Sequence, residues 1–230
     1  MSNTDAELQE AIAVRIASVR DRMQAAARRT GRDPAGIKLI AVSKSFDAAI
    51  VRAAYACGLR DFGENRVKEA ADKYAKLGDL RKDITLHMIG HLQTNKVRLA
   101  LDVFDLIHSV DSIKLAQEIN DRAINKIPVL IEVNIAEEES KFGFNVSRLK
   151  EIVELVGAMP NIEIRGLMMV APNMGDPEAV RPSFTQLKRI NDSFGLRELS
   201  MGMTDDFEVA IEEGSTMIRV GRAIFGERRS

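Results

Sequence analysis

The feature of this sequence that most constrains its fold is a repeated alternation of short apolar runs with helical patterns. Eight segments are candidate strands, centred near Ala41, Phe62, Met88, Ile107, Ile131, Ile164, Leu199 and Ile218. Helical patterns lie between them, for example over residues 46–57, 65–77, 112–125, 146–158 and 177–193. A strand and a helix repeated eight times predict an α/β fold with a closed, TIM-type β/α barrel, rather than an open doubly wound sheet.

The length of the chain fits one domain, and its charges are evenly mixed. At 230 residues the chain can fill a single barrel, so we expect one domain over residues 1–230. An amphipathic pattern from Thr4 to about Arg29 predicts an extra N-terminal helix, within residues 1–30, that packs on the barrel. The 33 basic and 34 acidic residues are well mixed and give a net charge of −1, which argues against a nucleic-acid-binding surface.

The sequence also carries signals about cellular location. No apolar run approaches the roughly 18 residues that a membrane-spanning helix needs. The first residues lack the basic and apolar regions of a signal peptide. The single cysteine, Cys57, excludes an internal disulfide and suits a reducing compartment. We therefore expect a cytoplasmic protein without a membrane partner.

Lys44 stands at the C-terminal end of the first predicted strand, residues 38–44. In β/α barrels this end of the strands carries the binding and catalytic groups. A lysine amine placed there can form a Schiff base with a carbonyl compound, provided that burial or a nearby cation keeps part of it unprotonated. Taken alone, a solvated lysine at a strand end is the simpler interpretation.

Two glycine-containing loops follow the seventh and eighth predicted strands, at residues 200–206 and 221–226. Loops in these positions of a β/α barrel often bind a phosphate through backbone amides and a helix N-terminus. Glycine lets the backbone approach the anion, and the hydroxyl of Ser200 adds a donor. Asp205 and Asp206 argue against such a site, and their simplest role is to complement the dipole of the following helix. Together with Lys44, the two loops predict a phosphate-binding site at the carboxyl end of the barrel.

Seven segments, in the same order along the chain, match a known protein family. They are residues 40–44 (IAVSK), 62–69 (FGENRVKE), 87–96 (HMIGHLQTNK), 140–143 (SKFG), 165–168 (RGLM), 199–206 (LSMGMTDD) and 214–226 (GSTMIRVGRAIFG). With these segments the sequence resembles the pyridoxal phosphate homeostasis protein family over nearly its whole length. The resemblance implies a barrel like the N-terminal domain of the alanine racemases.

The resemblance also implies a cofactor, pyridoxal 5′-phosphate, held as a Schiff base on Lys44. By motif position, Asn65 is expected near the cofactor ring, and Ser200 with the backbone amides around Gly221 and Arg222 is expected to hold the phosphate. Arg222 departs from the commonest family pattern, in which a small or hydroxylated residue stands, so a hydroxyl ligand is missing there. From the residue alone, Asn65 is equally suited to cap the following helix, because Asn is a preferred N-cap residue.

Arg219, by the same resemblance, is expected to face the pyridine nitrogen of the cofactor. An arginine stays protonated at neutral pH, so a ring nitrogen beside it stays unprotonated. An unprotonated pyridine is a poorer electron sink, and carbanion chemistry on the cofactor is then not strongly promoted. The alternative interpretation of Arg219 is a salt bridge across the barrel mouth.

The remaining polar candidates have simpler interpretations. His87, His91 and His108 are too scattered to argue for a metal site. We expect His87 and His108, at the ends of the third and fourth strands, to have a hydrogen-bonded structural role. Lys141 follows the fifth strand on the same rim as Lys44 and is a second candidate to accept the aldehyde, although a solvated loop lysine is the simpler interpretation.

Three functions are compatible with these features. The first is a protein that binds pyridoxal phosphate for intracellular vitamin B6 homeostasis without turning over a substrate, with apo-enzymes as candidate recipients of the cofactor. The second is a pyridoxal-phosphate-dependent amino-acid racemase. The third, a Schiff-base aldolase of a sugar phosphate, fits the barrel, the lysine and the phosphate loops but explains none of the motif matches.

The first two functions differ in whether a second acid/base residue is needed beside the lysine. A two-base racemase needs a positioned group on the far face of the cofactor. In the alanine racemases this is a tyrosine from a separate C-terminal domain, which we do not expect in this chain. Tyr55 and Tyr74 lie in helical patterns, away from the strand ends. We therefore favour the homeostasis function, with no catalytic residue, and expect a monomer.

Overall fold

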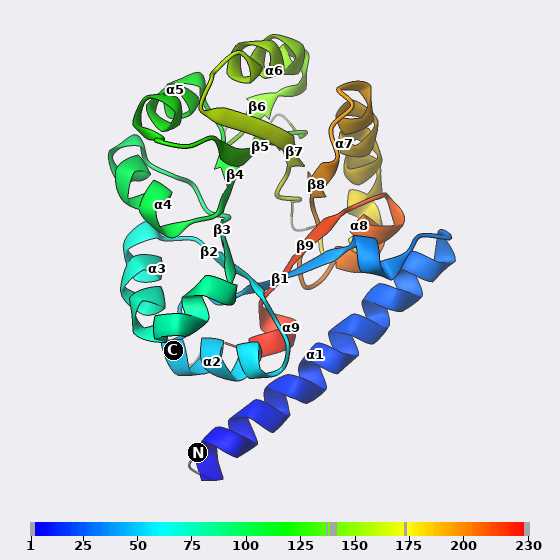
Figure 1. Cartoon of the computed structure of the whole chain (residues 1–230). Helices are drawn as coiled ribbons and strands as arrows, with labels where there is room; N and C mark the ends of the chain where they lie inside the picture. The colour runs from blue at the N-terminus through cyan, green and yellow to red at the C-terminus, as the bar shows by residue number, and fades with distance from the viewer. Residues whose placement is uncertain (1–2, 137, 139–141, 173, 228–230) are drawn as a thin grey trace.

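Eight parallel strands close into a barrel in the computed structural model, which describes residues 3–136, 138, 142–172 and 174–227. The strands are β1 Lys38–Val42, β2 Asp61–Glu64, β3 Thr85–Met88, β4 Leu106–Val110, β5 Ile127–Asn134, β7 Ile162–Met168, β8 Glu198–Ser200 and β9 Met217–Val220. They are hydrogen-bonded in the order β4-β3-β2-β1-β9-β8-β7-β5, and pairing of β4 with β5 closes the ring (Figure 1). Every predicted strand centre lies within one of these strands, so the predicted β/α barrel is confirmed.

The helices form the layer outside the strands (Figure 1). The α-helices of this layer are α2 Ala48–Ala56, α3 Val67–Tyr74, α4 Val97–Val103, α5 Ile113–Arg122, α6 Leu149–Gly157, α7 Arg181–Ser193, α8 Phe207–Glu212 and α9 Arg222–Phe225. Short 3-10 helices lie at Pro34–Gly36, Ala75–Asp83, Thr94–Lys96, Val146–Arg148 and Pro177–Val180. One strand was not predicted: β6, Phe144–Asn145, pairs with the carboxyl end of β5 beside the eight-stranded ring.

Capping side chains fix where several helices begin. The Oδ1 atom of Asp47 accepts hydrogen bonds from the backbone N–H groups of Ala49 (3.0 Å) and Ile50 (3.1 Å) at the start of α2. The Oγ atom of Ser112 accepts one from Leu115 (3.3 Å) at the start of α5. Such caps satisfy N–H groups that have no partner within the helix, and each stabilises the helix by about 1 kcal/mol. They end the loops that follow β1 and β4, and so help to shape the barrel mouth.

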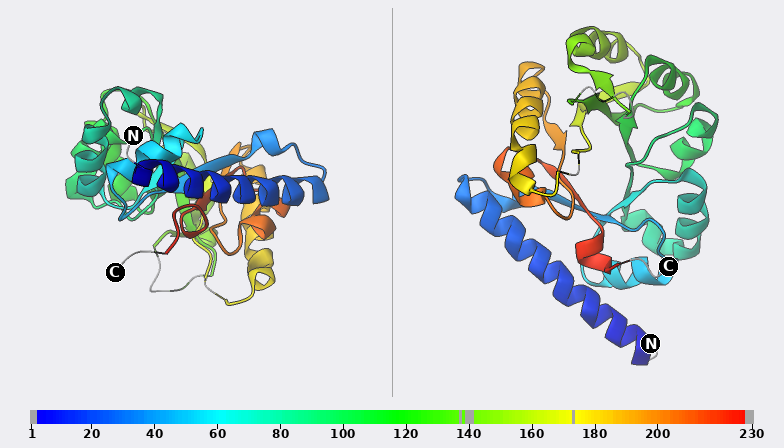
Figure 2. Two further views of the ribbon diagram at one scale, coloured as in Figure 1. Left: turned by 90° about the horizontal axis from the view of Figure 1, so that it is seen from below. Right: turned by 180° about the vertical axis from the view of Figure 1, so that it is seen from behind.

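The N-terminal helix α1, Asn3–Arg29, lies alongside the barrel rather than within the ring of helices (Figure 1, Figure 2). It begins one residue before Thr4, the predicted start. Its buried apolar side chains recur three or four residues apart, at Ile12, Ile16, Val19, Met23, Ala26 and Ala27. This stripe packs on α8, α2 and α9. Each large side chain of the stripe contributes about 1.5–3 kcal/mol by burial, which is how a lone surface helix is held.

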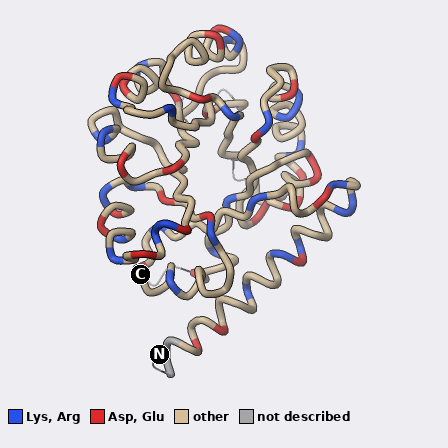
Figure 3. Tube along the Cα trace, in the orientation of Figure 1, with Lys and Arg blue, Asp and Glu red and all other residues tan. Residues whose placement is uncertain are grey.

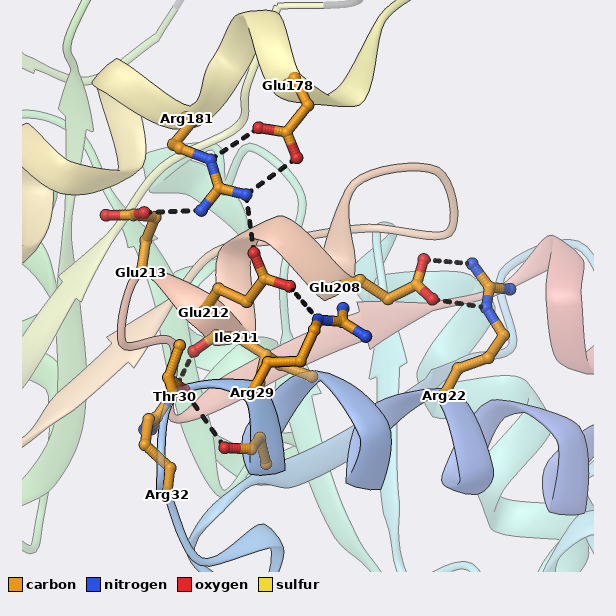
Figure 4. Close-up of polar contacts among 11 residues, drawn as sticks. Arg22, Arg29, Thr30, Arg32, Glu178, Arg181, Glu208, Ile211, Glu212 and Glu213 are labelled. Atoms are coloured by element: carbon orange, nitrogen blue, oxygen red, sulfur yellow. Dashed lines mark hydrogen bonds and ion pairs between the residues drawn. The ribbon is translucent and has the colours of Figure 1, made fainter.

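Ion pairs join the second half of α1 to α8, and α8 to the start of α7 (Figure 4). Arg22 contacts Glu208 twice, with Nε 3.1 Å from Oε1 and Nη2 2.8 Å from Oε2. Arg29 and Arg181 each contact Glu212, both at 2.6 Å. Because α8 follows the loop after β8, these contacts anchor one wall of the barrel mouth to α1.

Charges are interspersed elsewhere along the trace. Lys and Arg residues alternate with Asp and Glu residues on the helices of the outer layer (Figure 3). The mixing accords with the net charge of −1. Within the residues that the structure describes, no helix is both long enough and apolar enough to cross a bilayer.

The barrel has two separate apolar clusters, one on each side of its strands. The larger cluster fills the space between the strands and the helices. The smaller one lies inside the ring and consists of Ile40, Leu106, Leu130, Met168 and Met217. Successive side chains of a strand point to opposite faces, so Val42 continues the inner face of Ile40, and Lys44 follows two residues after the end of β1. Polar residues share the inner face with this small cluster, and they build the candidate site.

Candidate functional site

Lys44 leaves β1 on a backbone that is bent and held in place. Ser45 has a φ of 69°, which costs a residue with a side chain about 1–2 kcal/mol. The N–H of Ser45 donates to Oε1 of Glu69 (2.6 Å), and the N–H of Phe46 donates to the carbonyl of Ser43 (3.1 Å). These bonds turn the chain sharply from β1 into α2. The half-buried Lys44 is therefore presented at the carboxyl end of the barrel.

A buried polar cluster of Ser43, Glu64, Lys73 and Tyr74 lies behind Lys44 and joins β1 and β2 to α3. The Nζ atom of Lys73 donates to the Ser43 carbonyl and to Oε1 of Glu64, both at 2.8 Å. The Ser43 hydroxyl donates to the same Glu64 oxygen at 2.6 Å. Burial raises the pKa of Glu64, and the charge of Lys73 opposes this shift. Sequence reasoning missed the cluster, although a glutamate at the carboxyl end of the second predicted strand was a usable signal.

One sequence prediction is wrong at this cluster. Tyr74 lies in α3 as expected, but its side chain is not remote from the strand ends. Its hydroxyl lies 3.1 Å from Oγ of Ser43, at the carboxyl end of β1. The helical pattern placed the backbone of Tyr74 correctly, but it gave no information on where the end of the tyrosine side chain lies. Burial raises the pKa of Tyr74, so it remains a neutral hydrogen-bonding group at neutral pH.

Asn65 directly follows β2 and does not cap the next helix. The N-cap residue of α3 is Arg66, and its side chain makes no capping hydrogen bond. The capping interpretation of Asn65 is therefore wrong. In the described part of the chain, the buried Oδ1 atom of Asn65 has no hydrogen-bond partner. The backbone of Gly90 packs so closely on Asn65 that a Cβ at position 90 would lie 2.7 Å from the Asn65 carbonyl oxygen.

Arg219 projects from β9 into the barrel interior, where only 5% of it is exposed. Its Nη1 atom donates to the hydroxyl of Ser200 (2.5 Å) and its Nη2 atom to the carbonyl of Met169 (2.8 Å). Among the residues described, no carboxylate forms an ion pair with it, so the salt-bridge interpretation is not supported. Burial lowers the pKa of Arg219 to about 10, against the opposing charges of Glu132 and Asp206. The guanidinium is therefore protonated at neutral pH.

Ser200, at the end of β8, begins a chain of hydrogen bonds through the barrel interior. Its Oγ atom lies 2.9 Å from Nδ1 of His108. Nε2 of His108 lies 2.9 Å from Nδ1 of His87, and Nε2 of His87 lies 3.0 Å from Oδ1 of Asp61. Nζ of Lys38 lies 3.2 Å from the same Asp61 oxygen. The hydrogen-bonded role expected for the two histidines is confirmed, but they are fully buried inside the barrel and link its two ends.

The loop after β9 carries Gly221 and Arg222. Gly221 is the N-cap residue of α9, and a Cβ on it would lie 3.2 Å from the carbonyl oxygen of Val42 in β1. The Arg222 guanidinium is exposed and forms an ion pair with Asp205. Asp205 thus ties the loops after β8 and β9 together. Asp206 instead accepts a hydrogen bond from the backbone N–H of Met203 (2.5 Å). Asp205 and Asp206 therefore each have a specific partner, in addition to any interaction with the dipole of the following helix.

Glu132 is a titratable group at the barrel mouth that sequence reasoning missed. It is 8% exposed and lines a cavity of about 200 Å³ whose other walls include Phe142, Met169, Val170 and Pro172. Burial, with the charge of Asp111, raises the pKa of Glu132 to about 7, although Arg219 opposes the shift. A carboxyl inside the otherwise apolar β5 was the only signal for it.

A large cleft lies at the opposite end of the barrel. It measures about 770 Å³ and is lined by residues of α1 and by the amino ends of strands, among them Lys38, Asp61 and Thr216. In β/α barrels this end is associated with stability, and the chemistry takes place at the carboxyl ends of the strands. We therefore place the candidate site at the carboxyl end of the barrel, near Lys44, and not at this cleft.

Two further residues, Lys141 and His91, were considered from the sequence. Lys141 is outside the described residues, so its role stays a prediction. The ring of His91 stacks on Phe142, with ring centroids 3.9 Å apart, and its Nδ1 atom lies 2.6 Å from Oδ2 of Asp111. His91 therefore has stacking and hydrogen-bonded partners on the rim.

Comparison with known proteins agrees with this geometry. Residues 7–229 match the family described as alanine racemase, N-terminal domain. An alanine racemase from Corynebacterium glutamicum has the same fold, with a TM-score of 0.72 at 19% identity over 96% of this chain and 62% of that chain. The barrel is thus of the alanine racemase N-terminal type.

Closer relatives define the family more narrowly. A pyridoxal phosphate homeostasis protein of Aquifex aeolicus (strain VF5) is 45% identical over 94% of this chain and 97% of its own length. The structure of PipY from Synechococcus elongatus PCC7942, solved with pyridoxal phosphate bound, has a TM-score of 0.83 at 38% identity, covering 94% of this chain and 100% of that chain. The chain belongs to the pyridoxal phosphate homeostasis protein family.

Proposed function

We propose that this protein binds pyridoxal 5′-phosphate at the carboxyl end of its barrel, with Lys44 forming the Schiff base. The observation that carries the proposal is the position of the candidate residues on four adjacent strands of the ring. Lys44 follows β1, and Asn65 follows β2. Ser200 ends β8, and Arg219, Gly221 and Arg222 lie on and directly after β9. The name of the Aquifex relative and the cofactor bound to PipY support the same assignment.

The residues present fit this cofactor. Arg219 has five N–H donors, and Ser200 and Met169 engage two of its nitrogens, so further N–H groups are available for a ring nitrogen. The buried Oδ1 atom of Asn65, which has no partner among the described residues, is a polar atom that a ligand can satisfy. When bound, the cofactor supplies an aldehyde for an amine and a ring whose nitrogen, beside a protonated arginine, stays unprotonated.

Three residues are proposed to hold the phosphate. Ser200 supplies a hydroxyl, and Gly221 and Arg222 supply backbone amides at the start of α9. The Arg222 guanidinium is engaged with Asp205, so its contribution is that of the backbone. Losing one charge-assisted hydrogen bond typically costs about 1.5–3 kcal/mol. Ser200→Ala is therefore expected to weaken cofactor binding by that amount in an equilibrium titration, and unchanged affinity would relocate the phosphate site.

The proposed role is intracellular vitamin B6 homeostasis without substrate turnover, by one domain over residues 1–230 acting as a cytoplasmic monomer. Apo-enzymes that require the cofactor are its proposed recipients. The test mixes the loaded protein with an apo-enzyme of this kind and follows the recovery of enzyme activity. Recovery faster than spontaneous release of cofactor into buffer is expected for direct transfer. Recovery at the release rate would contradict direct transfer and leave the binding function intact.

Glu132 is the observation that favours the alternative, an amino-acid racemase. A carboxyl with a pKa of about 7 is well suited to proton transfer at neutral pH. We expect the loaded protein to racemise amino acids more slowly than the roughly 1 per second typical of slow enzymes. A rate above this that falls in Glu132→Gln would identify Glu132 as a catalytic acid or base and overturn the homeostasis role.

A further inference from the structure

When each histidine carries one proton, the hydrogen-bond chain from Ser200 to Asp61 has one direction, which the Asp61 carboxylate sets. An ionised Asp61 can only accept hydrogen bonds, and Arg219 can only donate them. His87 must then carry its proton on Nε2, toward Asp61, and accept at Nδ1. His108 must in turn donate from Nε2 to His87 and accept at Nδ1 from Ser200. Ser200 completes the chain, because it accepts from Arg219 and donates its only hydrogen to His108.

The charges around the chain support these protonation states. Complete burial, followed by the effects of His87, Arg219 and Lys38, holds the pKa of His108 well below its usual value, so this ring is neutral. Burial alone would raise the pKa of Asp61, but the hydrogen bond from His87 and the charge of Lys38 outweigh it and lower the pKa. The titratable groups that face the chain are Lys38 on β1, Asp61 on β2, His87 on β3, His108 on β4, Glu132 on β5, Asp206 after β8 and Arg219 on β9. Beside them, β7 contributes the apolar Met168, and the Met169 carbonyl directly follows it.

This direction has a consequence for ligands at the barrel mouth. The hydrogen of Ser200 points inward to His108, so it is not available to a phosphate. To donate to a phosphate, Ser200 must accept from Nδ1 of His108, and His108 must accept from Nδ1 of His87. Nε2 of a neutral His87 would then face the Asp61 carboxylate without a hydrogen between them. Adding one proton to His87 restores that bond, and the reversed chain is again complete.

We propose that Asp61, His87 and His108 are positioning residues for Ser200, and that binding of a phosphate group by the Ser200 hydroxyl draws one proton into the His87–Asp61 pair. The inference rests on the proposed role of Ser200 in phosphate binding. The proton has a route that avoids the mouth. Lys38 and Asp61 line the cleft at the opposite end of the barrel, where the Asp61 side chain is 22% exposed.

Pyridoxine 5′-phosphate is the appropriate probe, because its alcohol replaces the aldehyde and cannot form a Schiff base with Lys44. At about pH 8 its phosphate is fully ionised, since the second pKa of such a group is about 6. Calorimetric titration in two buffers of different ionisation enthalpy counts the protons that accompany binding. The wild-type protein is expected to take up about one proton, and its affinity is expected to fall about tenfold per pH unit above this pH.

Asp61→Asn is the informative variant. Its side-chain amide can donate to Nε2 of His87 and hold the reversed chain without an added proton. Proton uptake and the pH dependence of affinity are therefore expected to disappear in this variant, while affinity at about pH 8 equals or exceeds that of the wild type. Lys38→Gln is the control, because it removes the other Asp61 contact, keeps the carboxylate, and should retain the proton uptake.

The outcomes separate the inference from the function on which it rests. If Asp61→Asn takes up as many protons as the wild type while Ser200→Ala binds more weakly than the wild type, the proton linkage is wrong and the phosphate site stands. If Ser200→Ala binds the probe as tightly as the wild type, or if the wild type does not bind it, the phosphate site and the linkage both fall.

A measurement on the wild-type protein covers the case in which Asp61→Asn does not fold. Nitrogen NMR of the histidine rings distinguishes the two neutral tautomers from the doubly protonated ring. Without ligand, both His87 and His108 are expected to carry one proton, on Nε2. With bound pyridoxine 5′-phosphate, His87 is expected to be doubly protonated and His108 to carry its proton on Nδ1. Unchanged tautomers in the bound protein would overturn the proposal.

Discussion

The side-chain nitrogen of Lys73 lies 2.8 Å from the carbonyl oxygen of Ser43, the residue that immediately precedes Lys44. The same ammonium donates to Glu64, whose side chain is fully buried. The position of the lysine proposed to hold the cofactor therefore depends on a buried ion pair supplied by α3. A buried charge that loses its partner is far more costly than a surface charge that does so.

Lys73→Met removes one partner of this pair and leaves the Glu64 carboxyl without its cation. We expect the free energy of unfolding to fall by about 3 kcal/mol or more, as for other broken buried pairs. Urea unfolding without cofactor measures the change. The double variant Glu64→Gln/Lys73→Met is expected to recover part of the loss, because no buried carboxylate remains.

Lys68→Met, at an exposed position of the same helix, is the matched control and should change stability by less than about 0.5 kcal/mol. Equal losses in Lys73→Met and Lys68→Met would show that the buried pair does not support the loop that carries Lys44.

Glu132 gives an expected pH dependence of stability. Its pKa is raised to about 7 in the folded protein, mainly by burial, whereas a free glutamate has a pKa of about 4.3. The folded state therefore binds more protons than the unfolded state between these values. The contribution of Glu132 to stability is then present at low pH and is lost as the pH rises toward 7, by about 1.4 kcal/mol per pH unit and roughly 4 kcal/mol in all.

Glu132→Gln removes this titration. Relative to the wild type, the variant is expected to gain stability as the pH rises from about 5 to about 7, and urea unfolding across that range measures the difference. Glu151→Gln, on the exposed face of α6, should follow the wild-type curve. A constant difference between Glu132→Gln and the wild type over the whole range would contradict the raised pKa.

Arg22 tests how strongly α1 is anchored to the wall of the mouth. Its guanidinium pairs with Glu208 and lies 4.5 Å from the centre of the Phe207 ring. The side chains of the pair are 40% and 33% exposed, so solvent weakens the attraction. Arg22→Ala is expected to cost about 0.5–1 kcal/mol in urea unfolding, and less at high salt. A loss no greater than that of Arg28→Ala, an exposed arginine of the same helix, would mean that the pair contributes nothing measurable.

The fold was predictable because its signals are local. Several strands, such as β1 and β5, are mainly apolar runs, and the helix that follows a strand often begins at a residue such as Asp47 or Ser112 that caps it. Arg219 was placed correctly on its strand for the same reason, whereas the first strand ends at Val42, two residues before Lys44. The order and closure of the ring then follow from the alternation of strand and helix.

The buried polar groups were not predictable, because they depend on contacts between distant parts of the chain. Asp61, His87, His108 and Ser200 stand on four different strands, and only the registers within the closed ring bring their side chains together. Tyr74 was misplaced because a helical pattern does not indicate how far a long side chain reaches. The raised pKa of Glu132 depends on burial by segments far from it in sequence.

The central claim is that Lys44 holds pyridoxal 5′-phosphate, and the visible absorption spectrum of the protein with added cofactor tests it most directly. The wild type and Lys114→Ala, which changes an exposed lysine of α5, are expected to develop the band of a Schiff base, and Lys44→Ala is expected to lack it. Reduction with borohydride should fix the cofactor to the peptide that contains Lys44. A band of full intensity in Lys44→Ala, or no band in the wild type, would contradict the assignment.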